Sequence, residues 1–222
     1  MSVSVVIPAY NEEARIAGVI AGTERFADEI IVVDDASTDS TGDTARRLGA
    51  RVVANRYKKG YVGAIKTGLR EVRGEVVVTL DADGEHDPAD IPRLVAPILR
   101  DEADLVLGTR ETMGRVSEHL FNWLARLRVR VPDSCTGFRA MRRQLARELD
   151  LKGLCTCATL VLEADFRGAR VVGVPVAILP VNKPRRPAWR HLLQVFFALA
   201  WLLKRRRPTR KGRPAAHSGL TG

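Results

Sequence analysis

Apolar and polar positions in the first half of the chain repeat one unit: a short apolar run, a turn, and a longer stretch with helical periodicity. Runs rich in β-branched residues and bounded by turn residues predict strands, whereas longer stretches with one apolar face predict helices. The expected strands are residues 2–8, 29–35, 51–55, 75–81 and 104–108. The stretch after the second strand begins with several residues that favour a helix N-cap, which supports a helix there.

These strands are nearly continuous apolar runs, a pattern typical of strands that are buried on both faces. Their alternation with helices predicts an α/β fold with a mostly parallel central sheet and helices on both faces. In such folds, ligands bind beyond the carboxyl ends of the strands. Candidate functional residues are therefore expected directly after each strand.

Acidic side chains follow three of the expected strands. The three clusters are Glu12 in PAYNE after the first strand, Asp34 and Asp35 after the second, and Asp81, Asp83 and Glu85 in DADGE after the fourth. Any one cluster alone could be a solvated helix cap. Together at one edge, they would repel each other by about several kcal/mol unless a cation or sugar hydroxyls lay between them. Strand alternation in the short DADGE run predicts that its three carboxylates point the same way and suit Mg²⁺ or Mn²⁺, with coordination positions left open for a diphosphate.

The net charge of +10 is concentrated at the C-terminus. From Phe166 onward there are 13 Lys and Arg and no Asp or Glu, so the residues before Phe166 comprise 23 basic and 26 acidic ones. A nucleic-acid-binding domain is expected to spread its basic residues over a folded face, so this pattern favours an anionic surface as the partner and no nucleic acid. The three cysteines and the lack of an apolar leader favour a reducing, cytoplasmic setting, and their spacing does not indicate a zinc site.

Five motifs resemble, in the same order, those of the family 2 glycosyltransferases with the GT-A fold: VVIPAYNEE, IIVVDDASTDST, LDADGEHDPADIP, VLGTR and DSCTGFRA. The resemblance runs from residue 3 to about residue 180 and is strongest to the dolichyl- or polyprenyl-phosphate sugar transferases. It implies an inverting, metal-dependent enzyme that moves a sugar from a GDP- or UDP-sugar donor to a polyprenyl or dolichyl phosphate. A soluble transferase with a hydroxyl acceptor is the alternative among enzymes, and a nucleic-acid-binding protein is the alternative from another class.

The resemblance also implies a role for individual residues. Those bordering the nucleotide-sugar would be Pro8, Ala9, Tyr10, Glu12, Asp34, Asp35, Asp81 and Ala82. The metal, Mg²⁺ or Mn²⁺, would be held by Asp81, Asp83 and Glu85, the last of which is often glutamine in relatives. The reaction centre would contain Asp83, Arg110, Asp133 and Arg139, with Arg110 in contact with phosphate.

Several of these residues also have a structural alternative. Arg110 could be a surface arginine that caps a turn, and Asp133 could be structural. His86 is expected either to support the metal ligands or to lie on the surface. Glu163 matches a recurrent acid of the family, but it could equally pair with Arg167 one helical turn away.

After Pro180 the chain departs from relatives that carry transmembrane helices. Its apolar run, residues 192–203, has twelve residues, short of the roughly 20 that span a bilayer. Basic residues flank this run: Lys183, Arg185, Arg186 and Arg190 before it, and Lys204, Arg205, Arg206 and Arg207 after it. We expect residues 1–180 to form the catalytic domain, 181–207 an interfacial amphipathic helix, and 208–222 a disordered tail. The enzyme would then lie peripherally on the anionic inner face of the cell membrane; a core helix or a homodimer interface is the alternative.

Overall fold

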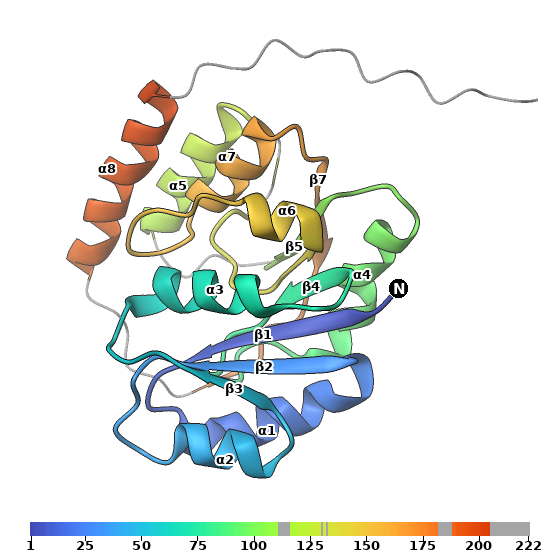
Figure 1. The fold of residues 1–222 in the computed structure, drawn as a ribbon. Helices are drawn as coiled ribbons and strands as arrows, with labels where there is room; N and C mark the ends of the chain where they lie inside the picture. The colour runs from blue at the N-terminus through green and yellow to red at the C-terminus, as the bar shows by residue number, and fades with distance from the viewer. Residues whose placement is uncertain (111–115, 130, 132, 182–187, 205–222) are drawn as a thin grey trace, which may run out of the picture.

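A seven-stranded sheet forms the centre of the molecule, in the strand order β3-β2-β1-β4-β6-β5-β7 (Figure 1). The computed structural model of the chain describes residues 1–110, 116–129, 131, 133–181 and 188–204. Its strands are β1 (Val3–Ala9), β2 (Glu29–Asp34), β3 (Arg51–Ala54), β4 (Val76–Thr79), β5 (Leu105–Thr109), β6 (Arg139–Arg142) and β7 (Val171–Pro175). Strand β6 is antiparallel to its neighbours β4 and β5, and the other pairs are parallel. The expected mostly parallel sheet is confirmed.

Helices cover both faces of this sheet. One face is covered by α1 (Glu13–Thr23), α2 (Thr41–Arg47) and α4 (Ile91–Leu99), with the 3-10 turns η1 (Glu24–Phe26) and η2 (Pro88–Asp90). The other face is covered by α3 (Gly60–Glu71), α5 (Val116–Arg126), α6 (Arg143–Glu148), α7 (Thr159–Phe166) and α8 (Ala188–Lys204). Successive strand residues face opposite sides, so that Val77 and Val78 belong to different apolar clusters.

The five strands predicted from the sequence are all present, and no end differs from the predicted one by more than two residues. Two strands were not foreseen. Strand β6 has the sequence RAMR, and its two arginines interrupt the apolar pattern that predicts a strand. Strand β7 pairs with β5 alone at the sheet edge and is only partly buried.

Helix α8 has two different faces. On its inner side Gln194 and Ala198 are fully buried, and Oε1 of Gln194 accepts hydrogen bonds from the backbone N–H groups of Leu154 and Cys155. Nε1 of Trp201 donates to Glu163 at 2.9 Å. The segment expected to lie apart from the catalytic domain therefore includes a helix that packs on the domain's core. Within the described ranges, no helix is both long and apolar enough to cross a bilayer.

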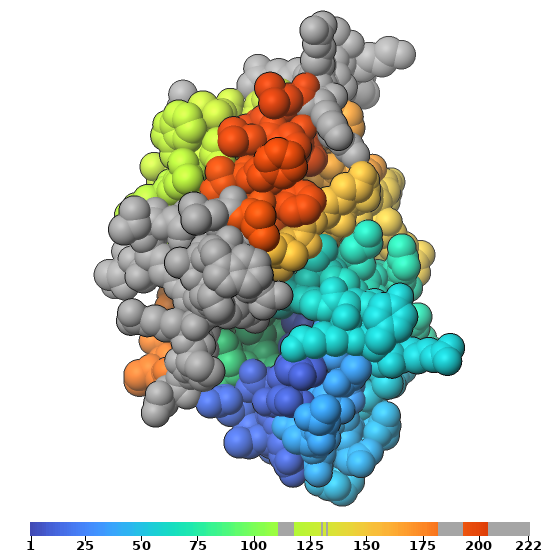
Figure 2. Space-filling view, turned by 90° about the vertical axis from the view of Figure 1, so that its left-hand side faces the viewer, coloured from blue at the N-terminus to red at the C-terminus, as the bar shows by residue number. Residues whose placement is uncertain are grey.

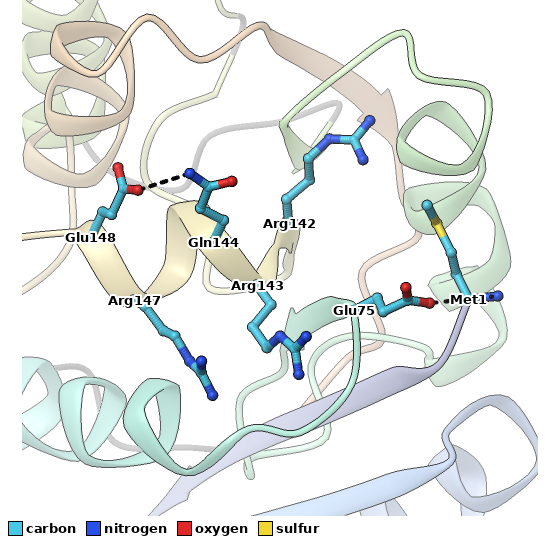
Figure 3. Close-up of a pocket in the computed structure, with 7 residues that line it drawn as sticks. All are labelled: Met1, Glu75, Arg142, Arg143, Gln144, Arg147 and Glu148. Carbon is cyan, nitrogen blue, oxygen red and sulfur yellow. Dashed lines mark hydrogen bonds and ion pairs between the residues drawn. The ribbon is translucent and has the colours of Figure 1, made fainter.

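A polar hollow lies at the amino ends of β1 and β4 (Figure 3). It has a volume of about 530 Å³ and is lined by Met1, Glu75, Arg142, Arg143, Gln144, Arg147 and Glu148. Its charged groups bond to protein: the N-terminal ammonium group lies 3.9 Å from Glu75, and guanidinium groups donate to backbone carbonyls. Because ligands of parallel sheets bind at the opposite edge, this hollow is not the candidate site.

Beside the hollow, an ion-pair network joins β5, β6 and the start of β7. It consists of Arg142, Arg170, Asp101 and Asp104. Asp104 accepts hydrogen bonds from Nε of Arg142 and from the backbone N–H and guanidinium group of Arg170. Burial alone would raise the pKa of Asp104, but hydrogen bonds from Arg170 and Arg142 outweigh it and lower the pKa to about 2. A lowered pKa in the folded state means that this carboxylate stabilises the fold above its unfolded pKa, and that this contribution is lost as the pH falls through about 2.

We predict that Asp104→Asn lowers the free energy of unfolding by about 1–2 kcal/mol at pH 7, because it removes an ionised partner from two partly exposed arginines. The difference from the wild type should shrink as the pH falls from 4 towards 2, which urea denaturation at several pH values can measure. Asp43→Asn is the control, since Asp43 makes an exposed ion pair with Arg46 and should contribute less than about 0.5 kcal/mol. A deficit that does not change with pH would contradict the assigned role of Asp104.

Candidate active site

The carboxyl ends of β2, β1 and β4 meet at one edge of the sheet, which faces the viewer in Figure 2. Green atoms of the segment after β4 lie recessed beside the blue and cyan surface of the N-terminal half. The three acidic clusters therefore share one edge, as the sequence predicted. Their surroundings differ, however, and the differences separate groups that hold the loops from groups that can act on a ligand.

The acidic segment after β4 is a turn and not an extended stretch. Strand β4 ends at Thr79, Gly84 has φ of 75°, and Oδ1 of Asp83 accepts a hydrogen bond from the N–H of Glu85 at 3.1 Å. Glycine adopts this left-handed conformation without the strain that a side chain would add. The argument that strand alternation points Asp81, Asp83 and Glu85 the same way is therefore wrong, although the turn keeps the three residues close in sequence.

Asp81 is the residue of this turn whose surroundings indicate a ligand. Its Oδ1 atom is buried and has no hydrogen-bond partner among the described residues. Burying a carboxylate oxygen without a partner is costly, so a buried and unpaired oxygen indicates a cation or donor group that completes its contacts.

Gly137 fixes the position of Asp81 from the other side. A Cβ atom built on Gly137 would lie only 2.2 Å from Oδ2 of Asp81, so the backbone approaches the carboxylate more closely than any side chain allows. The carbonyl of Gly137 also accepts a hydrogen bond from Oγ1 of Thr79 at 2.7 Å, which ties the segment to β4. The glycine is needed here for close approach; its φ is not among the positive values that a special turn would require.

Arg110 follows β5 directly and is held by two acids. Its Nε and Nη2 atoms donate to the two oxygens of Asp133 at 2.7 and 3.2 Å, and Oε2 of Glu118 lies 3.3 Å from Nη2. Burial would raise the pKa of Asp133, but the hydrogen bond and the charge of Arg110 outweigh it and lower the pKa. Asp133 is therefore ionised and a weak base, and its contacts orient Arg110 at the edge of the sheet.

His86 lies behind the acidic turn. It is 4% exposed, its ring packs against that of Phe138 with a tilt of 35° and 5.2 Å between centroids, and its backbone forms a bridge with Ile178. Burial lowers the pKa of His86, although the charges of Asp81, Glu85 and Asp83 act to raise it. The imidazole is therefore neutral near pH 7, and the alternative of a surface histidine is wrong.

Arg139, expected at the reaction centre, is fully buried in β6. Its Nη1 donates to Oγ1 of Thr156 at 2.7 Å, while Nε and Nη2 have no hydrogen-bond partner in the part of the chain that the structure describes. It occupies the start of β6, opposite Thr79 of β4, and so lies beneath the segment that contains Gly137. Its surroundings favour a role in supporting that segment, and contact with a ligand remains a prediction.

The second acidic cluster is engaged with the protein. Asp35 is 3% exposed and accepts hydrogen bonds from Asn55 and from the N–H groups of Lys59 and Gly60 at 2.7–2.9 Å, which fixes the start of α3. Oδ1 of Asp34 accepts a hydrogen bond from the N–H of Ser37. These contacts give both residues a structural role, and their predicted contact with the nucleotide stays a prediction.

The residues after β1 are bonded to the loop after β2 and to the start of α2. Asn11 exchanges hydrogen bonds with Thr38, and the N–H of Glu12 donates to Oγ1 of Thr41 at 2.8 Å. Tyr10 is 37% exposed, and Nζ of Lys58 lies 3.2 Å from the centroid of its ring. An exposed ring with a nearby cation suits an aromatic base next to phosphate. Pro8, Ala9 and Ala82 are buried and can shape this edge only through their backbone.

Among the described residues, no three His, Cys, Asp or Glu side chains form a group that could hold a metal ion. The carboxylates of the acidic turn nevertheless suit a metal ion that takes its remaining ligands from a bound molecule. Asp81 has a buried, unpaired oxygen, and Asp83 and Glu85 offer further carboxylate oxygens in the same turn. Mg²⁺ typically binds to one or two carboxylates and takes its other ligands from phosphate and water.

The sequence did not single out two residues of α5. Glu118 pairs with Arg110, and Oδ1 of the buried Asn122 accepts hydrogen bonds from the N–H and Oγ of Ser134 at 2.6 and 2.7 Å. A polar residue at an otherwise apolar helix position was the signal for Asn122.

For Glu163 the structural alternative is confirmed, since its carboxylate bonds to Arg167 and Trp201. The cysteines Cys135, Cys155 and Cys157 are free thiols.

The profile of the family described as Glycosyl transferase family 2 matches residues 4–150. The chain is 32% identical over 207 residues to an undecaprenyl-phosphate mannosyltransferase of Micrococcus luteus, with 81% of this chain and 84% of the relative covered. It is 28% identical to a dolichol-phosphate mannosyltransferase of Pyrococcus furiosus, with 79% and 56% covered.

A crystal structure of glucosyl-3-phosphoglycerate synthase from Mycobacterium tuberculosis, in complex with Mn²⁺, uridine diphosphate and glucosyl-3-phosphoglycerate, has a similar fold. The TM-score is 0.73 at 27% identity, with 91% of this chain and 78% of that chain covered. The complex of the same enzyme with phosphoglyceric acid has a TM-score of 0.76 at 28% identity, with 90% and 79% covered.

We predict that Gly137→Ala weakens Mn²⁺ binding about 10- to 100-fold, because the new methyl group displaces the carboxylate of Asp81. Calorimetric titration with Mn²⁺ in the presence of uridine diphosphate measures this. Gly18→Ala is the matched control, since a Cβ atom there meets nothing within 4 Å. Equal Mn²⁺ affinity in Gly137→Ala and the wild type would show that the position of Asp81 does not matter to the metal.

Proposed function

The chain belongs to glycosyl transferase family 2 and has the GT-A fold, and from this premise we propose that it is an inverting, metal-dependent transferase that moves a sugar from a GDP- or UDP-sugar to a polyprenyl or dolichyl phosphate. One observation carries the proposal: a buried, unpaired oxygen of Asp81 lies in an acidic turn at the carboxyl edge of the sheet. The lipid phosphate as acceptor is supported by the names of the relatives from Micrococcus luteus and Pyrococcus furiosus.

In this proposal Tyr10 and Lys58 border the nucleotide, while Asp81, Asp83 and Glu85 hold Mg²⁺ or Mn²⁺ beside the donor diphosphate. The metal supplies Lewis-acid stabilisation of the negative charge that develops on the leaving group. Asp133 and Glu118 keep the guanidinium of Arg110 oriented towards phosphate. Charge that is pre-oriented in this way stabilises a transition state without reorganisation during the reaction.

Transfer forms a bond between a phosphate oxygen of the acceptor and the anomeric carbon of the sugar. The bond from that carbon to the diphosphate breaks, and the nucleoside diphosphate leaves from the opposite side, so the configuration is inverted. A phosphate acceptor is already an anion near neutral pH and needs no general base. A hydroxyl acceptor needs one, and both oxygens of Asp133 already accept hydrogen bonds from the guanidinium of Arg110, which makes it a poor choice. This observation favours a phosphate acceptor over the hydroxyl alternative.

We also place the enzyme at the inner face of the cell membrane, where a lipid phosphate would be available. Two features of the sequence support this location: the clusters of Lys and Arg on either side of residues 192–203, and the absence of any Asp or Glu after residue 165. Basic segments are attracted to anionic leaflets by about 1 kcal/mol per residue near the surface.

A donor panel tests the proposed function directly. GDP- and UDP-sugars are supplied with Mn²⁺ and a short-chain polyprenyl phosphate, and the lipid product is detected by mass spectrometry. The proposal expects a glycosyl phosphate lipid from at least one donor. Transfer to a hydroxyl compound in the same assay, with none to the lipid phosphate, would favour the alternative acceptor.

We predict that Asp83→Asn lowers kcat by about 100-fold or more while the protein stays folded, because the change removes anionic charge from a partly exposed turn. Asp81→Asn should lower kcat similarly and also weaken donor binding in Mn²⁺. Transfer rates, donor titration and circular dichroism measure the three quantities. Unchanged donor affinity in both variants, or unfolding of either, would contradict the assignment.

We predict that Glu85→Gln keeps substantial activity and lowers metal affinity only modestly, since the amide preserves the shape of the side chain and removes only its charge. Steady-state kinetics over a range of Mn²⁺ concentrations should show a higher metal requirement with a similar maximal rate. Complete loss of activity would mean that the charge of Glu85 has a specific catalytic task.

A further inference from the structure

Residues 133–137 form a short segment that touches two groups of the candidate active site. At one end, the two carboxylate oxygens of Asp133 accept hydrogen bonds from Arg110 at 2.7 and 3.2 Å. At the other end, the backbone of Gly137 lies against Asp81, where a Cβ atom would come within 2.2 Å of Oδ2. We call residues 133–137 the linking segment. A displacement of this segment changes the surroundings of Arg110 and of Asp81 together.

A buried hydrogen-bonded pair holds the linking segment on helix α5. Oδ1 of Asn122 accepts hydrogen bonds from the backbone N–H and from Oγ of Ser134, at 2.6 and 2.7 Å. Asn122 is 1% exposed and Ser134 is fully buried, so water does not compete for these bonds. Movement of Ser134 away from Asn122 would leave buried donors without this acceptor, which costs free energy. The pair therefore fixes both the position and the orientation of Ser134.

An Asx turn passes this constraint on to Asp133. Oδ1 of Asp133 accepts a hydrogen bond from the N–H of Cys135 at 2.9 Å, which closes the turn around Ser134. The carboxylate is thus bound to the backbone on the far side of Ser134 while it also binds the guanidinium of Arg110. The position of Ser134 therefore determines where Asp133 presents its oxygens to Arg110.

Helix α5 holds Arg110 a second time, one turn earlier. Oε2 of Glu118 lies 3.3 Å from Nη2 of Arg110, and Glu118 precedes Asn122 by four residues. Residues four apart lie on the same side of a helix, so Glu118 and Asn122 face the same part of the site. One acid that binds Arg110 thus belongs to α5 itself, and the other, Asp133, is tied to α5 through Asn122.

An amide at position 122 is a costly choice for packing alone. Its neighbours Phe121, Leu124 and Ala125 are buried and apolar, and an aliphatic side chain of similar size would fill the same space without the burial of a polar group. The amide instead meets the residue of the linking segment from which Asp133 is positioned. Gln194 makes a comparable pair of hydrogen bonds on α8, but to a part of the chain outside the candidate site.

We infer that Asn122 is a positioning residue for the proposed transfer. Through Ser134 it sets the linking segment, and this segment in turn sets the orientation of Arg110 and the position of the Asp81 carboxylate. Asn122 itself is buried and acts on the ligands only through these residues. The inference rests on the proposed function and deepens it, because it makes the metal-binding carboxylate and the phosphate-binding arginine depend on one hydrogen-bonded pair. Residues that orient metal ligands in this way typically change metal affinity or activity by about 10- to 100-fold.

The first test replaces each of two buried amides by leucine in the full-length protein. Asn122→Leu removes the acceptor of Ser134 and keeps the approximate size of the side chain. Gln194→Leu is the matched control, since Oε1 of the fully buried Gln194 also accepts two hydrogen bonds, at 2.8 and 3.2 Å. Urea denaturation measures the stability of both variants, and transfer from a nucleotide-sugar to a short-chain polyprenyl phosphate with Mn²⁺ measures kcat. We expect both to lose stability, and kcat of Asn122→Leu to fall about tenfold or more below that of the control.

A second pair of variants isolates the hydroxyl group of Ser134 and serves also if Asn122→Leu does not fold. Ser134→Thr keeps Oγ, whereas Ser134→Val has the same shape as Ser134→Thr without the hydroxyl. We expect kcat to be about fivefold higher in Ser134→Thr than in Ser134→Val, because only the threonine can donate to Asn122. Equal kcat values in these two variants would overturn the inference, as would equal kcat values in Asn122→Leu and Gln194→Leu.

Mn²⁺ binding tests the inference without catalysis. Calorimetric titration in the presence of uridine diphosphate compares Asn122→Leu, Gly137→Ala and the double variant. Because both changes act on Asp81 through the linking segment, we expect the double variant to lose less affinity than the product of the two single losses. A loss equal to that product, or equal Mn²⁺ affinity in Asn122→Leu and Gln194→Leu, would show that Asn122 does not position the metal ligand and would overturn the inference.

These measurements separate the inference from the proposed function. If the wild type transfers sugar and Asn122→Leu matches Gln194→Leu in kcat and in Mn²⁺ affinity, the function stands and the inference is wrong. If no donor supports transfer by the wild type, yet Asn122→Leu binds Mn²⁺ more weakly than Gln194→Leu, the proposed reaction is wrong and Asn122 still positions the metal site.

Discussion

Repulsion among carboxylates at the carboxyl edge of the sheet is the constraint on which the other features of the site depend. Asp81, Asp83 and Glu85 lie in one turn, and Asp133 and Glu118 both pair with Arg110. His86 stays neutral because it is buried, so it does not offset this charge. Like charges at close range in a partly buried site repel by roughly several kcal/mol, and a bound cation is the most direct way to relieve such repulsion.

The fold holds these charges in place through structural contacts made by residues around the site. Asp35 fixes the start of α3, Gly137 allows the backbone to press against Asp81, and Asn122 ties the segment around Asp133 to α5. Insertion of the antiparallel β6 between β4 and β5 brings the Gly137 segment to the edge where parallel strands end. Helix α5 also carries Glu118, which pairs with Arg110, so one helix supports both sides of this ion pair's surroundings.

Much of this could be predicted from the sequence, because buried parallel strands are nearly continuous apolar runs and acidic residues directly follow them. The turn at Gly84 could not, since strand alternation was assumed to continue beyond Thr79. The pairing of Arg110 with Asp133 joins residues 23 positions apart and depends on the tertiary fold. Strand β6 was not predicted because its buried Arg139 contradicts the apolar pattern expected of a central strand. The twelve-residue apolar run was recognised, but only the structure shows that one face of α8 is part of the core.

The central claim is that the acidic turn binds a divalent cation together with the donor diphosphate. The protein binds each of the two more tightly when the other is present. Titration of Mn²⁺ into the protein, with and without a nucleoside diphosphate, measures the coupling between the two. By thermodynamic linkage, each should raise the affinity of the other by the same factor, about tenfold or more. Mn²⁺ affinity that is the same with and without the nucleotide, or nucleotide binding that is indifferent to Mn²⁺, would contradict the account.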